Sequence, residues 1–276
     1  IAQGGGKESH FFDNWRVYNS SQIAYYHKIF EHCKESPLVV DGTPEFMKTA
    51  ERIYDTYKQQ GTLNDLKIIF TLREPVSREI SWYNHRLRDC KSQQYAHSVC
   101  DKDGHPIPFQ SVMQKELVWR LEQKELHNVY GTYVQYLKLF FELFDRKRIL
   151  VLSYEETKSN QTAFLERIHR FLELPGEPQI LPHENSDHSK HEDPPCDVQR
   201  ALARRFERYN NELYELLEQH QGPDMEQRPF PRFHNKCFDE DIPEDEKDPF
   251  LSLPKATKHI IPNVLIAGGQ QSLTSA

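Results

Sequence analysis

The segment KIIFTLREPVSREISWY, from Lys67 to Tyr83, carries residues suited to holding a phosphate group. Its apolar run Ile68–Leu72 is typical of a buried parallel strand, and Pro75 ends that strand before a helical pattern begins. Arg73 and Ser81 therefore belong to the carboxyl end of a strand and to the helix after it. Open α/β sheets bind their ligands at this edge.

An arginine guanidinium binds two phosphate oxygens through charge-assisted hydrogen bonds, and a serine hydroxyl adds a further contact. Arg78 supplies a second positive charge in the same helix. The residues alone leave an alternative open, in which the arginines form a surface network with Glu74 and Glu79.

Strands and helices are predicted to alternate around this turn. The apolar runs expected to form strands are 38–40, 68–72, 149–152 and 264–267. The helical patterns that separate them cover 21–33, 44–60, 109–125, 130–144, 161–174 and 198–220. Strands that alternate with helices pair in parallel, so we expect a three-layer α/β fold with a central parallel sheet flanked by helices.

The carboxyl-terminal part of the chain differs in composition from the rest. Residues 237–260 are acidic and contain proline, which predicts a linker between a domain at 1–236 and a final segment at 261–276. That final segment, IPNVLIAGGQQSLTSA, has the pattern of a strand followed by a phosphate-binding loop. Residues 176–195 are rich in proline, histidine and acid, and predict a long loop.

The turn after the 68–72 strand resembles the 3′-phosphate-binding motif of sulfotransferases that use 3′-phosphoadenosine 5′-phosphosulfate (PAPS). The shared features are an arginine at the strand end, a proline two residues on, a second arginine, and a serine eight residues after the first arginine. The resemblance implies a P-loop NTPase-like fold with PAPS as co-substrate. Arg73 and Ser81 would hold the 3′-phosphate, with support from Arg78.

The segment KESHFFD near the start is similar to the E-x-H-F-F segment of heparan-type and related carbohydrate sulfotransferases. By this likeness Glu8 is the general base and His10 binds or orients the acceptor, with Lys7 also at the acceptor. Phe11 and Phe12 would partly desolvate the base. The alternative is a helix-capping aspartate, two core phenylalanines and a solvated glutamate.

Two further segments carry weaker likeness to the family. In VVDGTPEF, Thr43 matches the strand-turn motif near the acceptor, while Gly42 stands where heparan-type members have a lysine; Asp41 is expected to face the acceptor instead. In VYGTYVQYL, Gly131 and Tyr133 resemble the helix beside the acceptor cleft, with core packing as an equal alternative.

The tail resembles the family's 5′-phosphosulfate loop, which in relatives comes first in the chain. The motif order is therefore rotated, as in a fragment of a tandem array, which we favour, or in a circular permutant. The residues at the loop positions are Gln271, Ser272, Thr274 and Ser275. By the same likeness Lys190, in the 176–195 loop, would be a basic residue over the co-substrate. Because glutamine replaces the loop lysine, weak catalysis or a pseudoenzyme is an alternative.

Composition excludes several classes of protein. A net charge of −7 gives no broad basic field for a nucleic acid polymer or an anionic membrane, and no apolar stretch reaches the roughly 20 residues of a membrane span. The five cysteines form no CxxC pair, and the histidines of the 176–195 loop are irregularly spaced, so we expect no metal. Cys90 and Cys100 flank a polar loop that a disulfide can close. Sequons at Asn19 and Asn160 favour the Golgi lumen or the secretory pathway.

These patterns predict transfer of a sulfuryl group from PAPS to a hydroxyl or amine of a carbohydrate. The alternative from another class is a non-catalytic domain that binds PAPS or a glycan. A P-loop ATPase or nucleotide kinase is disfavoured because the tail lacks the lysine of that loop.

Overall fold

The computed structural model describes residues 2–3, 8–20, 23–33, 36, 38–88, 90, 98–126, 129–180, 193–223, 229–240, 242–243 and 245–253. Its helices are α1 (Trp15–Ser20), α2 (Ile23–Ile29), α3 (Ala50–Gln59), α4 (Pro75–Arg88), α5 (Phe109–Met113), α6 (Trp119–Gln123), α7 (Tyr133–Leu143), α8 (Glu156–Ser159), α9 (Gln161–Leu172) and α10 (Cys196–Gln219). Short helical turns at Pro44–Lys48 and Arg146–Arg148 precede α3 and the last strand.

Four described strands form two parallel pairs. Strand β3 (Ile68–Leu72) pairs with β4 (Ile149–Ser153) over its whole length, and β1 (Ala2–Gln3) pairs with β2 (Val39–Val40). The predicted parallel pairing is thus confirmed for these strands. The sheet is small and the described chain is mostly helical.

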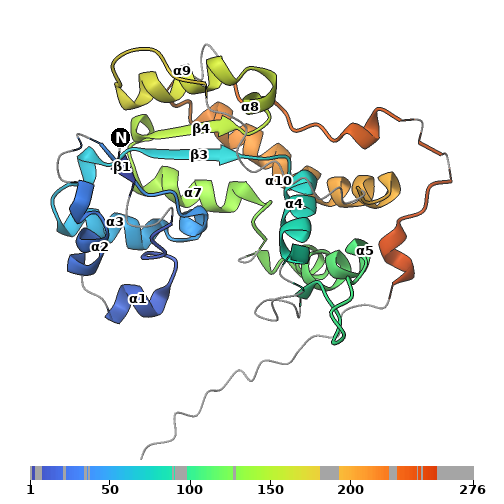
Figure 1. The fold of residues 1–276 in the computed structure, drawn as a ribbon. Coiled ribbons are helices and arrows are strands. Elements are labelled where there is room, and N and C mark those ends of the chain that lie inside the picture. The colour runs from blue at the N-terminus through green and yellow to red at the C-terminus, as the bar shows by residue number, and fades with distance from the viewer. Residues whose placement is uncertain are drawn as a thin grey trace, which may run out of the picture.

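Helices cover both faces of the β3–β4 pair, which gives three layers (Figure 1). Phe70, Leu72 and Val151 pack with α7 and the second half of α10. The alternate side chains Leu150 and Leu152 pack with α9. Both faces of a strand pair are therefore apolar, which explains why the two sequence runs are continuous rather than alternating.

A second hydrophobic cluster lies beside this sheet. It joins α4, α5, α6 and the first half of α10, and both Cys90 and Cys100 belong to it. These two cysteines form a disulfide, which confirms the sequence expectation. The helix predicted at 109–125 is present but contains a wider, π-helical turn at Gln114–Val118.

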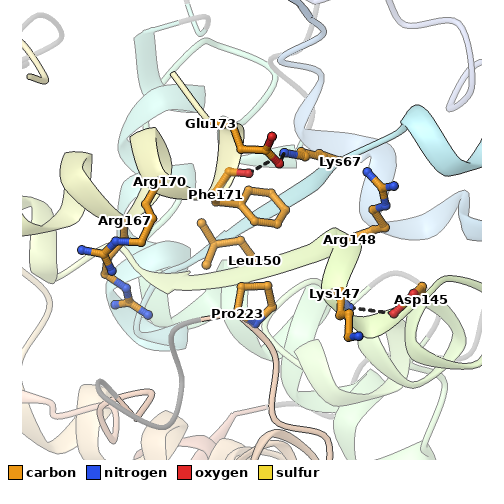
Figure 2. Close-up of a pocket in the computed structure, with 10 residues that line it drawn as sticks. All are labelled: Lys67, Asp145, Lys147, Arg148, Leu150, Arg167, Arg170, Phe171, Glu173 and Pro223. Atoms are coloured by element: carbon orange, nitrogen blue, oxygen red, sulfur yellow. Dashed lines mark hydrogen bonds and ion pairs between the residues drawn. The ribbon is translucent and has the colours of Figure 1, made fainter. Parts of the chain in front are cut away.

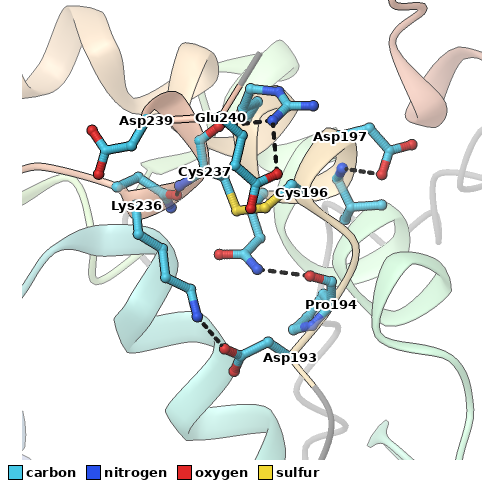
Figure 3. Close-up of a disulfide and its surroundings, with 12 residues drawn as sticks. Asp193, Pro194, Cys196, Asp197, Lys236, Cys237, Asp239 and Glu240 are labelled. Carbon is cyan, nitrogen blue, oxygen red and sulfur yellow. Dashed lines mark hydrogen bonds and ion pairs between the residues drawn. A yellow bond between two sulfur atoms is a disulfide. The ribbon is translucent and has the colours of Figure 1, made fainter. Parts of the chain in front are cut away.

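The segment from Cys237 to Leu253, here called the C-terminal strap, is fastened to α10 through several of its described residues. A disulfide joins Cys237 to Cys196 at the start of α10 (Figure 3). Phe250 is buried in the second cluster. Arg200 of α10 donates to the Cys237 carbonyl at 2.7 Å and to Glu246 at 2.9 Å. The acidic residues of the strap are therefore partners of α10.

Three short elements, β1, α1 and α8, were not predicted. The predicted strand at 264–267 lies outside the described residues. No described helix has the length and apolar character that a bilayer crossing requires.

Candidate active site

The turn between β3 and α4 is fixed by a buried glutamate. The Glu74 carboxylate accepts hydrogen bonds from the Val76 and Ser77 amides at 3.0 and 2.7 Å, so it caps the start of α4. Burial raises the pKa of Glu74, and these bonds oppose the shift. The Glu74 amide in turn donates to Glu155 after β4 at 2.8 Å. Glu74 therefore belongs to the turn and not to a surface network.

Arg73 is the cation that this turn presents. Its guanidinium lies over the Tyr154 ring at 5.0 Å, and no described carboxylate forms an ion pair with it. Ser81 is exposed on α4, two turns into the helix. Arg78 differs, because it pairs with Glu79 at 2.6 Å and lies over the Tyr130 ring at 4.7 Å. The predicted arginine–glutamate network is thus present for Arg78 and absent for Arg73 within the described chain.

Gly131 and Tyr133 support the turn from α7. The Tyr133 hydroxyl donates to the Arg73 carbonyl at 2.7 Å, and its side chain is buried. A Cβ at Gly131 would lie 2.8 Å from a ring carbon of Phe206 and 3.1 Å from Pro75 Cβ, so only glycine fits there. These positions favour the packing alternative over acceptor contact.

The end of β2 holds the segment that carries the predicted base. The Thr43 hydroxyl accepts from the Ser9 and His10 amides at 2.9 and 3.3 Å, and donates to Asp41 at 2.8 Å. Asp41 also accepts from the hydroxyls of Ser9 and Tyr26 at 2.5 and 3.1 Å. Asp41 is therefore occupied within the protein, which corrects the expectation that it faces the acceptor. Thr43 is buried, and its hydroxyl holds the backbone of Ser9 and His10 in place.

Glu8, His10 and Asp13 form a continuous row of titratable groups. His10 Nδ1 lies 2.7 Å from Asp13 Oδ2, and Nε2 lies 3.1 Å from Glu8 Oε2. The hydrogen bond with Asp13 is the main cause of the raised pKa of His10, and the charges of Asp13 and Glu8 add to it. Phe11 and Phe12, both 1% exposed, anchor the segment in the core while Glu8 stays one-third exposed.

His10 has a positive φ of 49°, in the left-handed region that non-glycine residues seldom adopt. Such a conformation costs about 1 kcal/mol. The hydrogen bond from the His10 amide to the Thr43 hydroxyl and the two carboxylates at the ring nitrogens stabilise this conformation. With this backbone conformation the His10 ring contacts Glu8. Strained residues of this kind cluster at functional sites.

A cluster that the sequence did not reveal connects the two halves of the site. The Tyr130 hydroxyl donates to Glu45, and Lys48 contacts the same hydroxyl and lies 3.6 Å from the ring centre. The Arg78 guanidinium also lies over the Tyr130 ring. The charge of Glu45 contributes to the raised pKa of His10, after the larger effects of Asp13 and Glu8. Burial lowers the pKa of Lys48. The Glu45–Lys48 spacing of i, i+3 was a visible signal, but the tyrosine comes from a distant segment.

The remaining predicted residues, and the histidines 183, 188 and 191, lie outside the described part of the chain. The predicted site residues among them are Lys7, Lys190, Gln271, Ser272, Thr274 and Ser275.

The site combines Arg73, which has no ion pair within the described chain and follows β3, with a carboxylate–histidine row that follows β1. This arrangement suits an α/β transferase with a phosphorylated substrate. A family model described as "Sulfotransferase domain" matches residues 5–198. The chain therefore belongs to the sulfotransferase family, which confirms the resemblance at that level. Sulfotransferases of this family generally use PAPS as sulfuryl donor.

A solved structure supports the same fold. The sulfotransferase from Alicyclobacillus acidocaldarius is similar with a TM-score of 0.57 and 20% identity, over 79% of this chain and 85% of that one. At this identity the likeness establishes the P-loop-containing α/β fold. No curated protein matches the chain significantly.

Proposed function

We propose that this chain transfers a sulfuryl group from PAPS to a hydroxyl or amine of a carbohydrate, with Glu8 as the general base. The observation that carries the proposal is the row of Glu8, His10 and Asp13 that follows β1, together with Arg73 at the carboxyl end of β3. The carbohydrate acceptor is supported by the likeness of KESHFFD to that branch of the family.

In this reaction the acceptor oxygen or nitrogen attacks sulfur while its proton passes to the Glu8 carboxylate. The sulfur–oxygen bond to the nucleotide phosphate breaks, and 3′,5′-ADP leaves. Imidazolium at His10, favoured by its raised pKa, donates toward Glu8 and fixes the carboxylate. Arg73 and Ser81 would hold the 3′-phosphate, since Arg73 has no ion-pair partner among the described residues and Ser81 is exposed on α4.

The base is tested by Glu8→Gln, which keeps the size of the side chain and removes its proton-accepting charge. We expect sulfate incorporation from labelled PAPS into a mixed glycan acceptor to fall about 10²–10⁴-fold. Glu142→Gln on the exposed face of α7 is the matched control and should leave the rate unchanged. Unchanged incorporation in Glu8→Gln would remove the catalytic assignment.

Nucleotide binding is tested separately by a thermal-shift titration with 3′,5′-ADP, against 5′-ADP and ATP. We expect a shift only with the 3′-phosphorylated nucleotide, and its loss in Arg73→Ala. A specific shift without any sulfate incorporation would favour the second candidate, a non-catalytic PAPS- or glycan-binding domain. Gly42, which stands in place of the family lysine, is the observation behind that candidate.

We also propose that the protein works in an oxidising compartment of the secretory pathway. Two disulfides, Cys90–Cys100 and Cys196–Cys237, support this, because disulfides persist mainly in such compartments. The sequon residues Asn19 and Asn160 are both exposed. A mobility shift after glycosidase treatment of the protein from its native source tests the proposal, and reduced cysteines there would contradict it.

A further inference from the structure

A basic cavity lies at the amino ends of β3 and β4, at the opposite end of the strands from Arg73 (Figure 2). Its volume is about 600 Å³. Lys67 precedes β3, and Arg148 precedes β4. Since a strand rises about 3.3 Å per residue, Lys67 at the cavity and Arg73 at the other end of β3 are roughly 20 Å apart. It therefore forms a separate site.

Positive charge dominates the lining of this cavity. Its cations come from the strand ends and from α9: Lys67, Lys147, Arg148, Arg167 and Arg170. Two carboxylates, Asp145 and Glu173, also line it, and Glu156 pairs with Arg167 at 2.8 Å. The lining residues that the structure describes thus include five cations and two carboxylates. This excess stands out in a chain whose net charge is −7.

Part of this charge has a structural use. Lys67 donates to the Phe171 carbonyl at 2.7 Å and pairs with Glu173 at 2.8 Å, so it stabilises the carboxyl end of α9. Lys147 and Arg148 lie in the short turn Arg146–Arg148 and not at the end of a helix that they could stabilise in this way. Within the described residues, neither side chain has a carboxylate at ion-pair distance.

The charge of Arg148 nevertheless reaches into the cavity, since it contributes to the lowered pKa of Glu173. Lys147 and Arg148 thus place two cations at its rim that have no carboxylate partner among the described residues. Phe171 and Pro223 add apolar surface to the same lining. Cations suit sulfate groups, and apolar surface suits the carbon face of a sugar ring, so the combination matches a sulfated sugar better than a bare phosphate ion.

We propose that this cavity is a second binding site for a sulfated oligosaccharide. The choice of ligand rests on the proposed function: a sulfated glycan is the product of that reaction, and the cavity would retain a modified chain while the opposite edge acts on another part of it. Lys147 and Arg148 bind sulfate groups, and the apolar lining contacts the sugar.

The test is a fluorescence-anisotropy titration of the full chain with labelled dextran sulfate hexasaccharide. We expect Lys147→Ala/Arg148→Ala to weaken binding roughly tenfold or more, because two charge-assisted contacts are lost. The matched control is Lys138→Ala/Arg208→Ala, which removes two exposed cations near Glu212 on the α7–α10 surface. The control should bind as the wild type does.

Equal weakening in both double variants, or none in either, would overturn the proposal, because binding would then be general electrostatics or lie elsewhere. Unsulfated dextran hexasaccharide should not compete. If inorganic pyrophosphate competes as strongly as the sulfated oligosaccharide, the ligand is a small phosphate and the glycan assignment is wrong. The thermal shift with 3′,5′-ADP should be the same in both double variants, so this result is independent of the Arg73 and Glu8 tests.

Discussion

Replacement of Gly131 by alanine separates the two interpretations of this residue. Its Cβ would meet Phe206 ring carbons at 2.8 and 3.0 Å and Pro75 Cβ at 3.1 Å, all closer than van der Waals contact. Gly131 is not in the left-handed region, so alanine brings a steric cost rather than backbone strain. Overpacking of this kind costs about 1–3 kcal/mol, which corresponds to a fall in Tm of about 2–6 °C for a chain of this size.

The assay combines Tm with steady-state kinetics. Gly131→Ala should lower Tm and weaken binding of 3′,5′-ADP, because displacement of Pro75 moves the Arg73 turn. Phe206→Leu alone should also destabilise, by about 1–2 kcal/mol. The double variant should be more stable than the sum of the two effects, since the smaller leucine makes room for the new methyl group.

Two outcomes would refute the reasoning. An unchanged Tm with a raised KM for the acceptor would show that Gly131 contacts the acceptor, as the family likeness implied. Strict additivity of the two substitutions would show that their side chains do not meet, and that the packing explanation is wrong.

Three further predictions concern the strap and the histidine row. Cys196→Ala/Cys237→Ala opens a loop with a sequence separation of 41 and should lower the free energy of unfolding by about 2–4 kcal/mol in urea titration without reductant. Asp13→Asn should lower the pKa of His10 toward about 6.5 in an NMR titration. Because the folded pKa is raised, the stability that His10 contributes is present at low pH and is lost as pH rises through that pKa. Glu246→Gln should remove stability that the wild type has at neutral pH and loses as pH falls through the lowered pKa of this carboxyl; identical acid transitions would contradict this.

The sheet and its flanking helices were predictable because their signals are local. The runs at 68–72 and 149–152 are mostly apolar, and the segments between them have the helical period, so parallel pairing followed. The Arg73 turn was predictable for the same reason. A strand end, a proline and a helix start are neighbours in sequence.

The strap and the Tyr130 cluster were not predictable, because their partners are far apart in the chain. The sequence shows that the strap is acidic, but it does not show that Arg200 and Arg205 of α10 bind its carboxylates and hold it against that helix. Tyr130 meets Lys48 across 82 residues and Glu45 across 85. The positive φ of His10 was not predicted, because histidine adopts this conformation only occasionally and its ring contacts with Glu8 and Asp13 are seen only in the structure.

The division of the strand side chains between two clusters implies unequal local stability. Helix α9 is held by the small cluster around Leu150 and Leu152, whereas α7 and α10 share the large cluster on the other face. Regions with fewer buried contacts open at lower free energy. Amide hydrogens of α9 should therefore exchange with solvent before those of α7, and a ligand in the basic cavity, which contacts α9, would slow that exchange without contact to the reacting groups.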